Sequence, residues 1–298
     1  MSEGQIRQSL SGFYDIYSEG QTYRTRARGN FRKRKITPLV GDRVTFESTS
    51  PKEGYVLEIL PRDNELTRPP VANVDQGVVV TAVASPEFST GLLDRQLIAL
   101  EVSDITPVIY FTKTDLIDDA RYQEFETLAA GYRKIGYTVC LTREPFAKAG
   151  LDQLKATLKG QETVIMGQTG AGKSTLLNHI SPDLALATGE ISTALNRGKH
   201  TTRKVSLMPI AGGLVADTPG FSSYETLTID YRDLCHYFPE FLNVASDCRF
   251  RGCVHVNEPG CAVKAGLANG DFLQSRYDNY LQLLTLLKNQ KPIYNKKK

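Results

Sequence analysis

The chain has 298 residues, of which 41% are hydrophobic and 23% are charged, and its formal net charge is +3. This composition is typical of a folded protein of two or three domains and excludes an intrinsically disordered chain. No stretch approaches the length of a membrane span and the N-terminus lacks a signal-peptide pattern, so we expect a cytoplasmic protein with no membrane partner. In a reducing compartment, five cysteines favour metal binding or free thiols over disulfides.

Residues 1–66 contain short β-rich segments separated by glycines, at 12–17, 22–28, 42–47 and 55–60. This pattern predicts a small antiparallel barrel. One stretch of it carries eight basic residues against a single acid, with Tyr23 and Phe31 interleaved; the basic residues are Arg24, Arg26, Arg28, Arg32, Lys33, Arg34, Lys35 and Arg43. Such a face suits RNA phosphates and stacked bases, although an ordinary solvated basic surface explains the same pattern.

The proline-rich residues 62–73 predict a stiff linker, and the pattern then changes to buried strands alternating with amphipathic helices. Strands are expected at 78–83, 107–111, 138–141 and 162–166, and helices at 92–102, 121–135 and 174–180. This alternation predicts an α/β domain with a mainly parallel sheet over residues 67–225.

Residues 167–174 match the phosphate-loop pattern G-x-x-x-x-G-K-[ST] between a predicted strand and a predicted helix. The glycines let the backbone turn its amides toward a triphosphate, Lys173 would reach the β and γ phosphates, and Ser174 would hold Mg²⁺. We therefore expect nucleotide contacts along the whole loop, from Gly167, Gln168, Thr169, Gly170, Ala171, Gly172, Lys173, Ser174 and Thr175.

Two further motifs indicate a guanine nucleotide. Asp217 to Gly220 form D-x-x-G after an apolar strand, where the Asp can hold Mg²⁺ through water and the Gly amide can sense the γ-phosphate. The run Thr112, Lys113, Thr114, Asp115 fits [NT]-K-x-D, in which the carboxylate accepts two hydrogen bonds from the N1 and N2 edge of guanine. Adenine offers no such donor pair, so GTP and GDP are the expected ligands.

The order of these motifs is unusual, because the guanine motif precedes the phosphate loop along the chain. In ordinary GTPases it follows the D-x-x-G segment, so the domain is predicted to be circularly permuted. Permutation preserves the neighbours of each strand and moves only the chain ends. The residues attached at the new ends, beside the guanine motif and after D-x-x-G, can therefore respond to the nucleotide.

Residues 184–203 separate the phosphate loop from D-x-x-G and are rich in small and polar residues. We expect this segment to order around Mg²⁺ and the γ-phosphate, with Thr202 (or Thr201) as the metal-contacting hydroxyl. Phe221 stands where many GTPases place the Gln that orients the attacking water. We therefore hypothesise slow intrinsic hydrolysis, with His200 or a partner group positioning the water; a solvated loop histidine is the alternative.

The C-terminal unit, residues 226–298, is predicted to be mainly helical and to bind a metal. Cys248, Cys253, His255 and Cys261 give C-x4-C-x-H-x5-C, and three thiolates with one imidazole suit a closed, structural Zn²⁺ site. The remaining thiols, Cys140 and Cys235, have no ligand spacing and are expected in the core. Arg249 and Arg251 lie between the ligands and could meet an anionic partner, and a helix over 276–288 presents an apolar face for packing.

Together these features resemble the bacterial ribosome small-subunit-dependent GTPase A family: a barrel, T-K-x-D ahead of G-Q-[ST]-G-x-G-K-S, R-G-K-H-T-T-R, D-T-P-G-F and the C-x4-C-x-H-x5-C knuckle. The resemblance covers essentially the whole chain. It implies an OB fold at the N-terminus, GTP hydrolysis stimulated by the ribosome, and the 30S subunit with its 16S rRNA as partner during late subunit maturation. We expect the protein to be a monomer.

Two other functions stay open from the residues alone. A P-loop kinase or ATPase would need tolerance of adenine, against which Asp115 argues. A non-enzymatic RNA-binding scaffold would not need the intact Lys173, Ser174 and Asp217.

Overall fold

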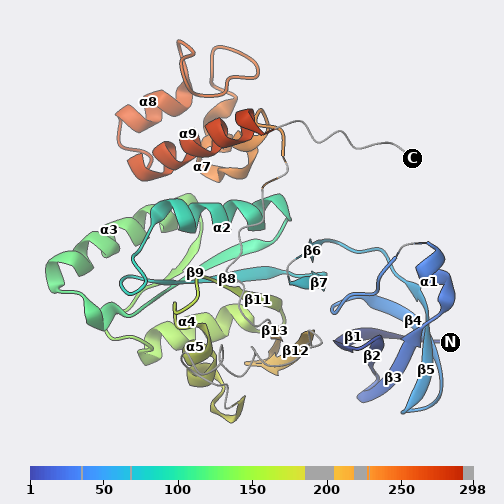
Figure 1. The fold of residues 1–298 in the computed structure, drawn as a ribbon. Coiled ribbons are helices and arrows are strands. Elements are labelled where there is room, and N and C mark those ends of the chain that lie inside the picture. The colour runs from blue at the N-terminus through green and yellow to red at the C-terminus, as the bar shows by residue number, and fades with distance from the viewer. Residues whose placement is uncertain (35, 68, 185–204, 218–226, 228, 291–298) are drawn as a thin grey trace.

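The computed structural model describes residues 1–34, 36–67, 69–184, 205–217, 227 and 229–290 (Figure 1). Five strands close the N-terminal barrel: β1 (Ser2–Leu10), β2 (Phe13–Ser18), β3 (Gln21–Ala27), β4 (Arg43–Ser50) and β5 (Glu53–Ile59). They pair in the order β1-β2-β3-β5-β4, β4 returns to β1, and β3 runs parallel to β5. A short helix, α1 (Gly29–Lys33), lies between β3 and β4. The predicted OB-like barrel is confirmed.

The strand β1 was absent from the predicted elements. Its sequence is almost entirely polar, and of its nine residues only Ile6 and Leu10 are apolar. Ile6 is nevertheless fully buried, because β1 is the strand on which the barrel closes and its neighbours cover that one side chain. A single buried residue leaves too weak a period for a strand to be recognised from sequence.

The prediction of a stiff linker over residues 62–73 was wrong. This stretch contains a hairpin of β6 (Glu65–Thr67) and β7 (Pro70–Ala72), whose Val71 is fully buried. Arg62 adds a bidentate ion pair with the buried Asp42 of the barrel, at 2.7 and 2.9 Å. Prolines suit short edge strands as well as linkers, which explains the error.

The second domain is an α/β domain, as predicted. The strands β10 (Thr138–Cys140), β9 (Thr106–Thr112), β8 (Gln76–Ala82), β11 (Glu162–Met166) and β13 (Gly213–Asp217) lie side by side and all run parallel. The strand β12 (Val205–Ile210) is antiparallel to β13. Each predicted strand and helix of this domain coincides with an observed one to within two residues, and the helix α4 (Lys148–Leu158) is an addition.

Helices cover both faces of this sheet (Figure 1). One face carries α2 (Thr90–Val102) and α3 (Asp119–Ile135), and the other carries α4 and α5 (Lys173–Ile180). Fully buried β-branched side chains such as Val78, Val79 and Val80 point alternately to the two sides and fill both layers. Among the described residues, no helix is long and apolar enough to cross a membrane.

The C-terminal unit is helical and packs on α2 (Figure 1). Its elements are the 3-10 helix η3 (Leu234–Tyr237), α7 (Pro239–Ala245), α8 (Ala262–Ala268) and α9 (Gln274–Asn289). A fully buried charge network joins this unit to the α/β domain: Arg276 donates to Asp94 of α2 at 2.8 Å and to Glu240 of α7 at 2.7 and 3.0 Å. Asn279 and Tyr132 also donate to Asp94, so its carboxylate is fully hydrogen-bonded.

The barrel and the α/β domain share one continuous sheet. The barrel strand β1 pairs with β12 through Gln8↔Ser206 and Ser9↔Val205. Beside this junction, the Gln5 amide donates to the carboxylate of Glu162, the first residue of β11. Burial raises the pKa of Glu162 to about 7, an effect that the Gln5 hydrogen bond opposes and Asp75 reinforces.

We predict that Glu162 makes stability depend on pH. Because its pKa is higher in the folded than in the unfolded chain, the folded state binds more protons, and stability falls as the pH rises from about 4.5 toward 7. Glu162→Gln should therefore raise the free energy of unfolding at pH 8 by on the order of 1–2 kcal/mol and leave it nearly unchanged at pH 4.5. Urea denaturation at both pH values measures this.

The matched control is Glu58→Gln, which alters an exposed carboxylate on β5. It should leave the pH dependence as it is in the unaltered protein. Identical pH dependence in the Glu162→Gln variant and the unaltered protein would contradict the prediction.

Candidate functional site

The predicted phosphate loop connects the end of β11 to the start of α5. Gly167 has φ 140° and lies so close to β8 that a Cβ atom there would stand 2.1 Å from the carbonyl oxygen of Val80. Gly172 has φ 93° and forms the N-cap of α5, a conformation that residues with side chains rarely adopt. The loop therefore needs glycine at both positions, and it presents the N-terminus of α5 to a ligand.

Lys173 folds back over this loop. Its Nζ donates to the carbonyl oxygens of Gly167 and Gln168, at 2.7 and 2.9 Å. Burial lowers the pKa of this amine relative to its ordinary value. The ammonium group is thus held at the centre of the loop, where a phosphate oxygen would be a stronger partner than the two carbonyls.

The guanine motif begins at the end of β9. Thr112 is the last residue of that strand and Lys113 is left-handed, with φ 61°. The turn carries the chain into a 3-10 helix, η1 (Thr114–Leu116), in which the side chain of Asp115 is exposed. Its carboxylate is open to a ligand on the same edge of the sheet as the phosphate loop.

A direct hydrogen bond joins the two loops. The hydroxyl of Thr112 donates to the carbonyl oxygen of Ala171 at 2.6 Å, and both residues are fully buried. Because β9 and β11 flank β8 in a parallel sheet, their carboxyl ends meet at one edge. The segments predicted to hold base and phosphate therefore lie side by side, although the base segment comes first in the sequence.

Two residues that the motifs did not reveal support the guanine loop. Arg143, which follows β10, donates to the carbonyl oxygens of Thr114 and Ile117 and pairs with Asp119. On the other side, the ammonium group of Lys113 donates to the carbonyl oxygen of Ser85. The sequence gave no signal for Arg143, because the carbonyls that it contacts are brought to it by the tertiary fold.

The D-x-x-G segment is described only to the end of its strand. Asp217 is the last residue of β13, and its backbone pairs with Ser206 at the same sheet edge as the phosphate loop. Gly220 and Phe221 lie outside the described residues. So do the predicted switch residues His200, Thr201 and Thr202, whose roles stay predictions.

The four predicted metal ligands come together in the C-terminal unit. The ligand atoms of Cys248, Cys253, His255 and Cys261 all lie within 4.8 Å of one another. Nδ1 of His255 is 3.6 Å from the Cys248 sulfur and 3.4 Å from the Cys261 sulfur. A tetrahedral ion with ordinary Zn–N and Zn–S bonds would set such atoms roughly 3.6 Å apart, so the donor set fits a metal of that kind.

The loop that carries these ligands is anchored from behind. The hydroxyls of Tyr277 and Tyr280 on α9 donate to the carbonyl oxygens of His255 and Val254, at 2.7 and 3.0 Å. Three backbone amides, those of Val254, Val256 and Asn257, donate to the Glu258 carboxylate. Burial raises the pKa of Glu258, but these amides lower it by more, so the pKa lies below its ordinary value. The cluster is preorganised for a metal.

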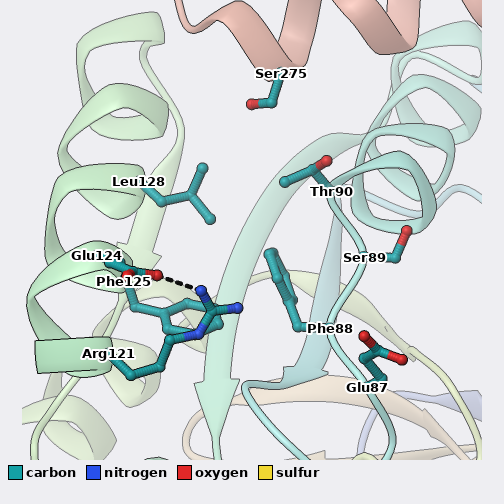
Figure 2. Close-up of a pocket in the computed structure, with 9 residues that line it drawn as sticks. All are labelled: Glu87, Phe88, Ser89, Thr90, Arg121, Glu124, Phe125, Leu128 and Ser275. Atoms are coloured by element: carbon teal, nitrogen blue, oxygen red, sulfur yellow. Dashed lines mark hydrogen bonds and ion pairs between the residues drawn. The ribbon is translucent and has the colours of Figure 1, made fainter.

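A cavity of about 630 Å³ lies between α2, α3 and the start of α9, and its lining contains no residue of the nucleotide motifs (Figure 2). Phe88 and Phe125 form an aromatic floor with ring centroids 4.9 Å apart. Arg121, the cation of its lining, is paired with Glu124. The cavity marks the seam between the α/β domain and the C-terminal unit, and its lining also carries the exposed carboxylate of Glu87.

Two models of known protein families match this chain. The family model described as RsgA GTPase matches residues 59–227, and the one described as RsgA N-terminal domain matches residues 3–56. The chain belongs to the RsgA GTPase family. This RsgA-family protein is therefore an enzyme that hydrolyses GTP, as the nucleotide motifs predicted.

Relatives and solved structures agree over the full length. The chain is 66% identical to small ribosomal subunit biogenesis GTPase RsgA 1 of Lactiplantibacillus plantarum, covering all of both chains. It is 56% identical to small ribosomal subunit biogenesis GTPase RsgA of Enterococcus faecalis, over 99% of this chain and 98% of the relative. The crystal structure of YloQ, a circularly permuted GTPase, superposes with a TM-score of 0.83 at 44% identity, covering 99% of this chain and 97% of that one. The predicted permutation is confirmed.

We predict that the Thr112–Ala171 hydrogen bond supports nucleotide binding. Thr112→Val keeps the shape of the side chain but removes the donor, so the phosphate loop loses its tie to the guanine loop. We expect GTP affinity to fall by about fivefold to tenfold and stability by about 1 kcal/mol. Fluorescent guanine-nucleotide titration and urea denaturation measure the two effects.

The matched control is Thr163→Val. Thr163 is equally buried, and its hydroxyl is hydrogen-bonded at 2.9 Å by Gln76 near the opposite end of the sheet. This variant should lose similar stability with unchanged GTP affinity. Equal affinity losses in both variants would mean that the Thr112 effect is only a loss of general stability.

Proposed function

We propose that this protein hydrolyses GTP during biogenesis of the small ribosomal subunit, with the 30S subunit and its 16S rRNA as partner. The observation that carries the proposal is the buried contact between the Thr112 and Ala171 loops, which supports one site for guanine and phosphates. The partner is supported by the relatives, whose names describe GTPases of small ribosomal subunit biogenesis.

In the proposed complex, the loop from Gly167 to Thr175 surrounds the phosphates and Lys173 moves from its two carbonyl partners to the β and γ phosphates. The guanine edge is held by Asp115, with Thr112, Lys113 and Thr114 shaping the loop. Mg²⁺ would be held by Ser174, Asp217 and Thr202, and it would neutralise charge on the phosphates. Arg143 keeps the guanine loop in its open, exposed geometry.

Hydrolysis itself is proposed to depend on the partner. Phe221 cannot orient a water molecule, so GTP hydrolysis by the protein without its partner is slow. Docking on the 30S subunit would bring His200 to the attacking water, and release of the γ-phosphate would then weaken the complex.

The barrel is proposed to bind rRNA through a hollow of about 300 Å³. The guanidinium carbons of Arg26 and Arg24 lie 4.4 and 6.0 Å from the ring centroid of Phe13, and Tyr55 nearby is 44% exposed. An aromatic ring flanked by arginines suits a stacked base beside a phosphate.

The two aromatic residues that the sequence suggested for this surface, Tyr23 and Phe31, pack against the barrel in the structure. Phe31 is 8% exposed and belongs to the barrel core, and Tyr23 packs on Phe46 with ring centroids 5.2 Å apart. We propose Phe13 and Tyr55 instead for the stacking role that the sequence suggested for Tyr23 and Phe31.

The C-terminal cluster is proposed to hold one structural Zn²⁺. Three thiolates and an imidazole fill a tetrahedral shell and leave no position for a catalytic water. Arg249 and Arg251 on the same loop are exposed and would meet rRNA phosphates.

We further propose three domains, at residues 1–66, 67–225 and 226–298, in a monomer that works in the cytoplasm.

The test is GTP hydrolysis by the purified protein alone, with 30S subunits and with 50S subunits. We expect slow turnover alone, strong stimulation by 30S only, and no turnover in any of the three conditions for Lys173→Ala, because the phosphate charge is then left without its cation. Equal turnover in all three conditions would remove the ribosome from the mechanism. A complete lack of turnover with subunits present would favour the scaffold alternative, and efficient competition by ATP would favour an ATPase.

The same assay with a barrel variant tests whether the hollow at Phe13 contacts the 30S subunit. Arg26→Ala removes a cation from the Phe13 hollow, so it should raise the 30S concentration needed for half-maximal stimulation without altering turnover alone. Lys159→Ala, which changes an exposed cation after α4, is its control. An unchanged 30S requirement in Arg26→Ala would exclude this hollow from the contact.

A further inference from the structure

The ring of His255 has a separate partner at each nitrogen. Nδ1 faces the sulfurs of Cys248 and Cys261, at 3.6 and 3.4 Å. On the opposite side, Nε2 lies 3.0 Å from the sulfur of Cys235. The imidazole is therefore held between the ligand cluster and a thiol outside the C-x4-C-x-H-x5-C motif.

Cys235 cannot itself be a ligand of the ion that the cluster would bind. An ion bonded to Nδ1 lies on the far side of the ring from Nε2, so a sulfur in contact with Nε2 is roughly 7 Å from that ion. Cys235 lies in η3, 20 residues before His255, and is 5% exposed. The sequence placed it in the core, which is correct, but its contact gives it a further role.

We propose that Cys235 is a positioning residue for the zinc ligand His255. Its sulfur accepts the Nε2–H hydrogen bond, which keeps the proton on Nε2 and leaves the Nδ1 lone pair free for the ion. A histidine that ligates a metal generally donates its other N–H to such a partner, which fixes the tautomer and the orientation of the ring. The inference rests on the proposed zinc site.

The backbone around His255 explains why the ring needs this support. His255 has φ 57°, in the left-handed region, and its carbonyl is fixed by the Tyr277 hydroxyl at 2.7 Å. These contacts hold the main chain but leave the torsions of the side chain free. The hydrogen bond to Cys235 restrains the far end of the ring, so the imidazole is held in the orientation in which Nδ1 faces the thiolates.

The experiment measures zinc release from the full-length protein into an excess of a coloured chelator. Cys235→Val fills the space of the thiol without an acceptor, and it should release zinc about tenfold faster than the unaltered protein. Cys235→Ser keeps an acceptor at a slightly longer reach, so its release rate should lie between the two. Cys140→Val is the matched control, because it changes a buried cysteine in β10, away from the cluster.

Faster release in Cys235→Val, partial rescue in Cys235→Ser and unchanged release in Cys140→Val would support the proposal. An unaltered rate in Cys235→Val, no difference between Cys235→Val and Cys235→Ser, or equal acceleration in Cys140→Val would overturn it. Circular dichroism at the assay temperature confirms that each variant is folded. Metal analysis of the unaltered protein tests the zinc site separately from the role of Cys235. Less than one zinc per chain would contradict the zinc site itself.

Discussion

The nucleotide site depends on the parallel order β9-β8-β11, which brings two loops to one edge of the sheet. The hydrogen bond from Thr112 to Ala171 joins those loops across 59 residues of sequence. A parallel sheet gathers the residues that follow its strands at the carboxyl edge, regardless of which strand comes first in the chain. The order of motifs can therefore be permuted while the relation between guanine loop and phosphate loop is kept.

The permuted ends of the α/β domain are tied to the flanking units by two different physical means. The barrel joins through backbone pairing, because β1 extends the sheet onto β12, the strand that leads through a tight turn to β13 and Asp217. The C-terminal unit joins through a buried ion network in which Arg276 pairs with Asp94 of α2. Removing one partner of such a network leaves a buried charge without compensation, so this contact favours a fixed orientation of the two units.

The sequence predicted those parts in which a local pattern carries the information. Buried strands such as β8 and β11 were found to within two residues, and the spacing of the three cysteines and His255 correctly predicted that they lie together. Features decided by distant contacts were missed or misjudged: the polar strand β1, the hairpin within the supposed linker, and the support that Arg143 gives to the guanine loop. Arg276 shows the same limit, because a charged residue on a helix is expected in solvent until its distant partner is known.

The central claim is that Asp115 recognises the guanine edge in the same site as the phosphate loop. The most direct measurement compares affinities for GTP and for xanthosine triphosphate in the unaltered protein, in Asp115→Asn and in Asp152→Asn, an exposed carboxylate on α4. Xanthine carries a carbonyl where guanine has its amino group, so an asparagine amide can donate to it. The account predicts that Asp115→Asn loses GTP affinity by about tenfold or more and gains affinity for the xanthine nucleotide, while Asp152→Asn changes neither. Unchanged preference in Asp115→Asn would contradict it.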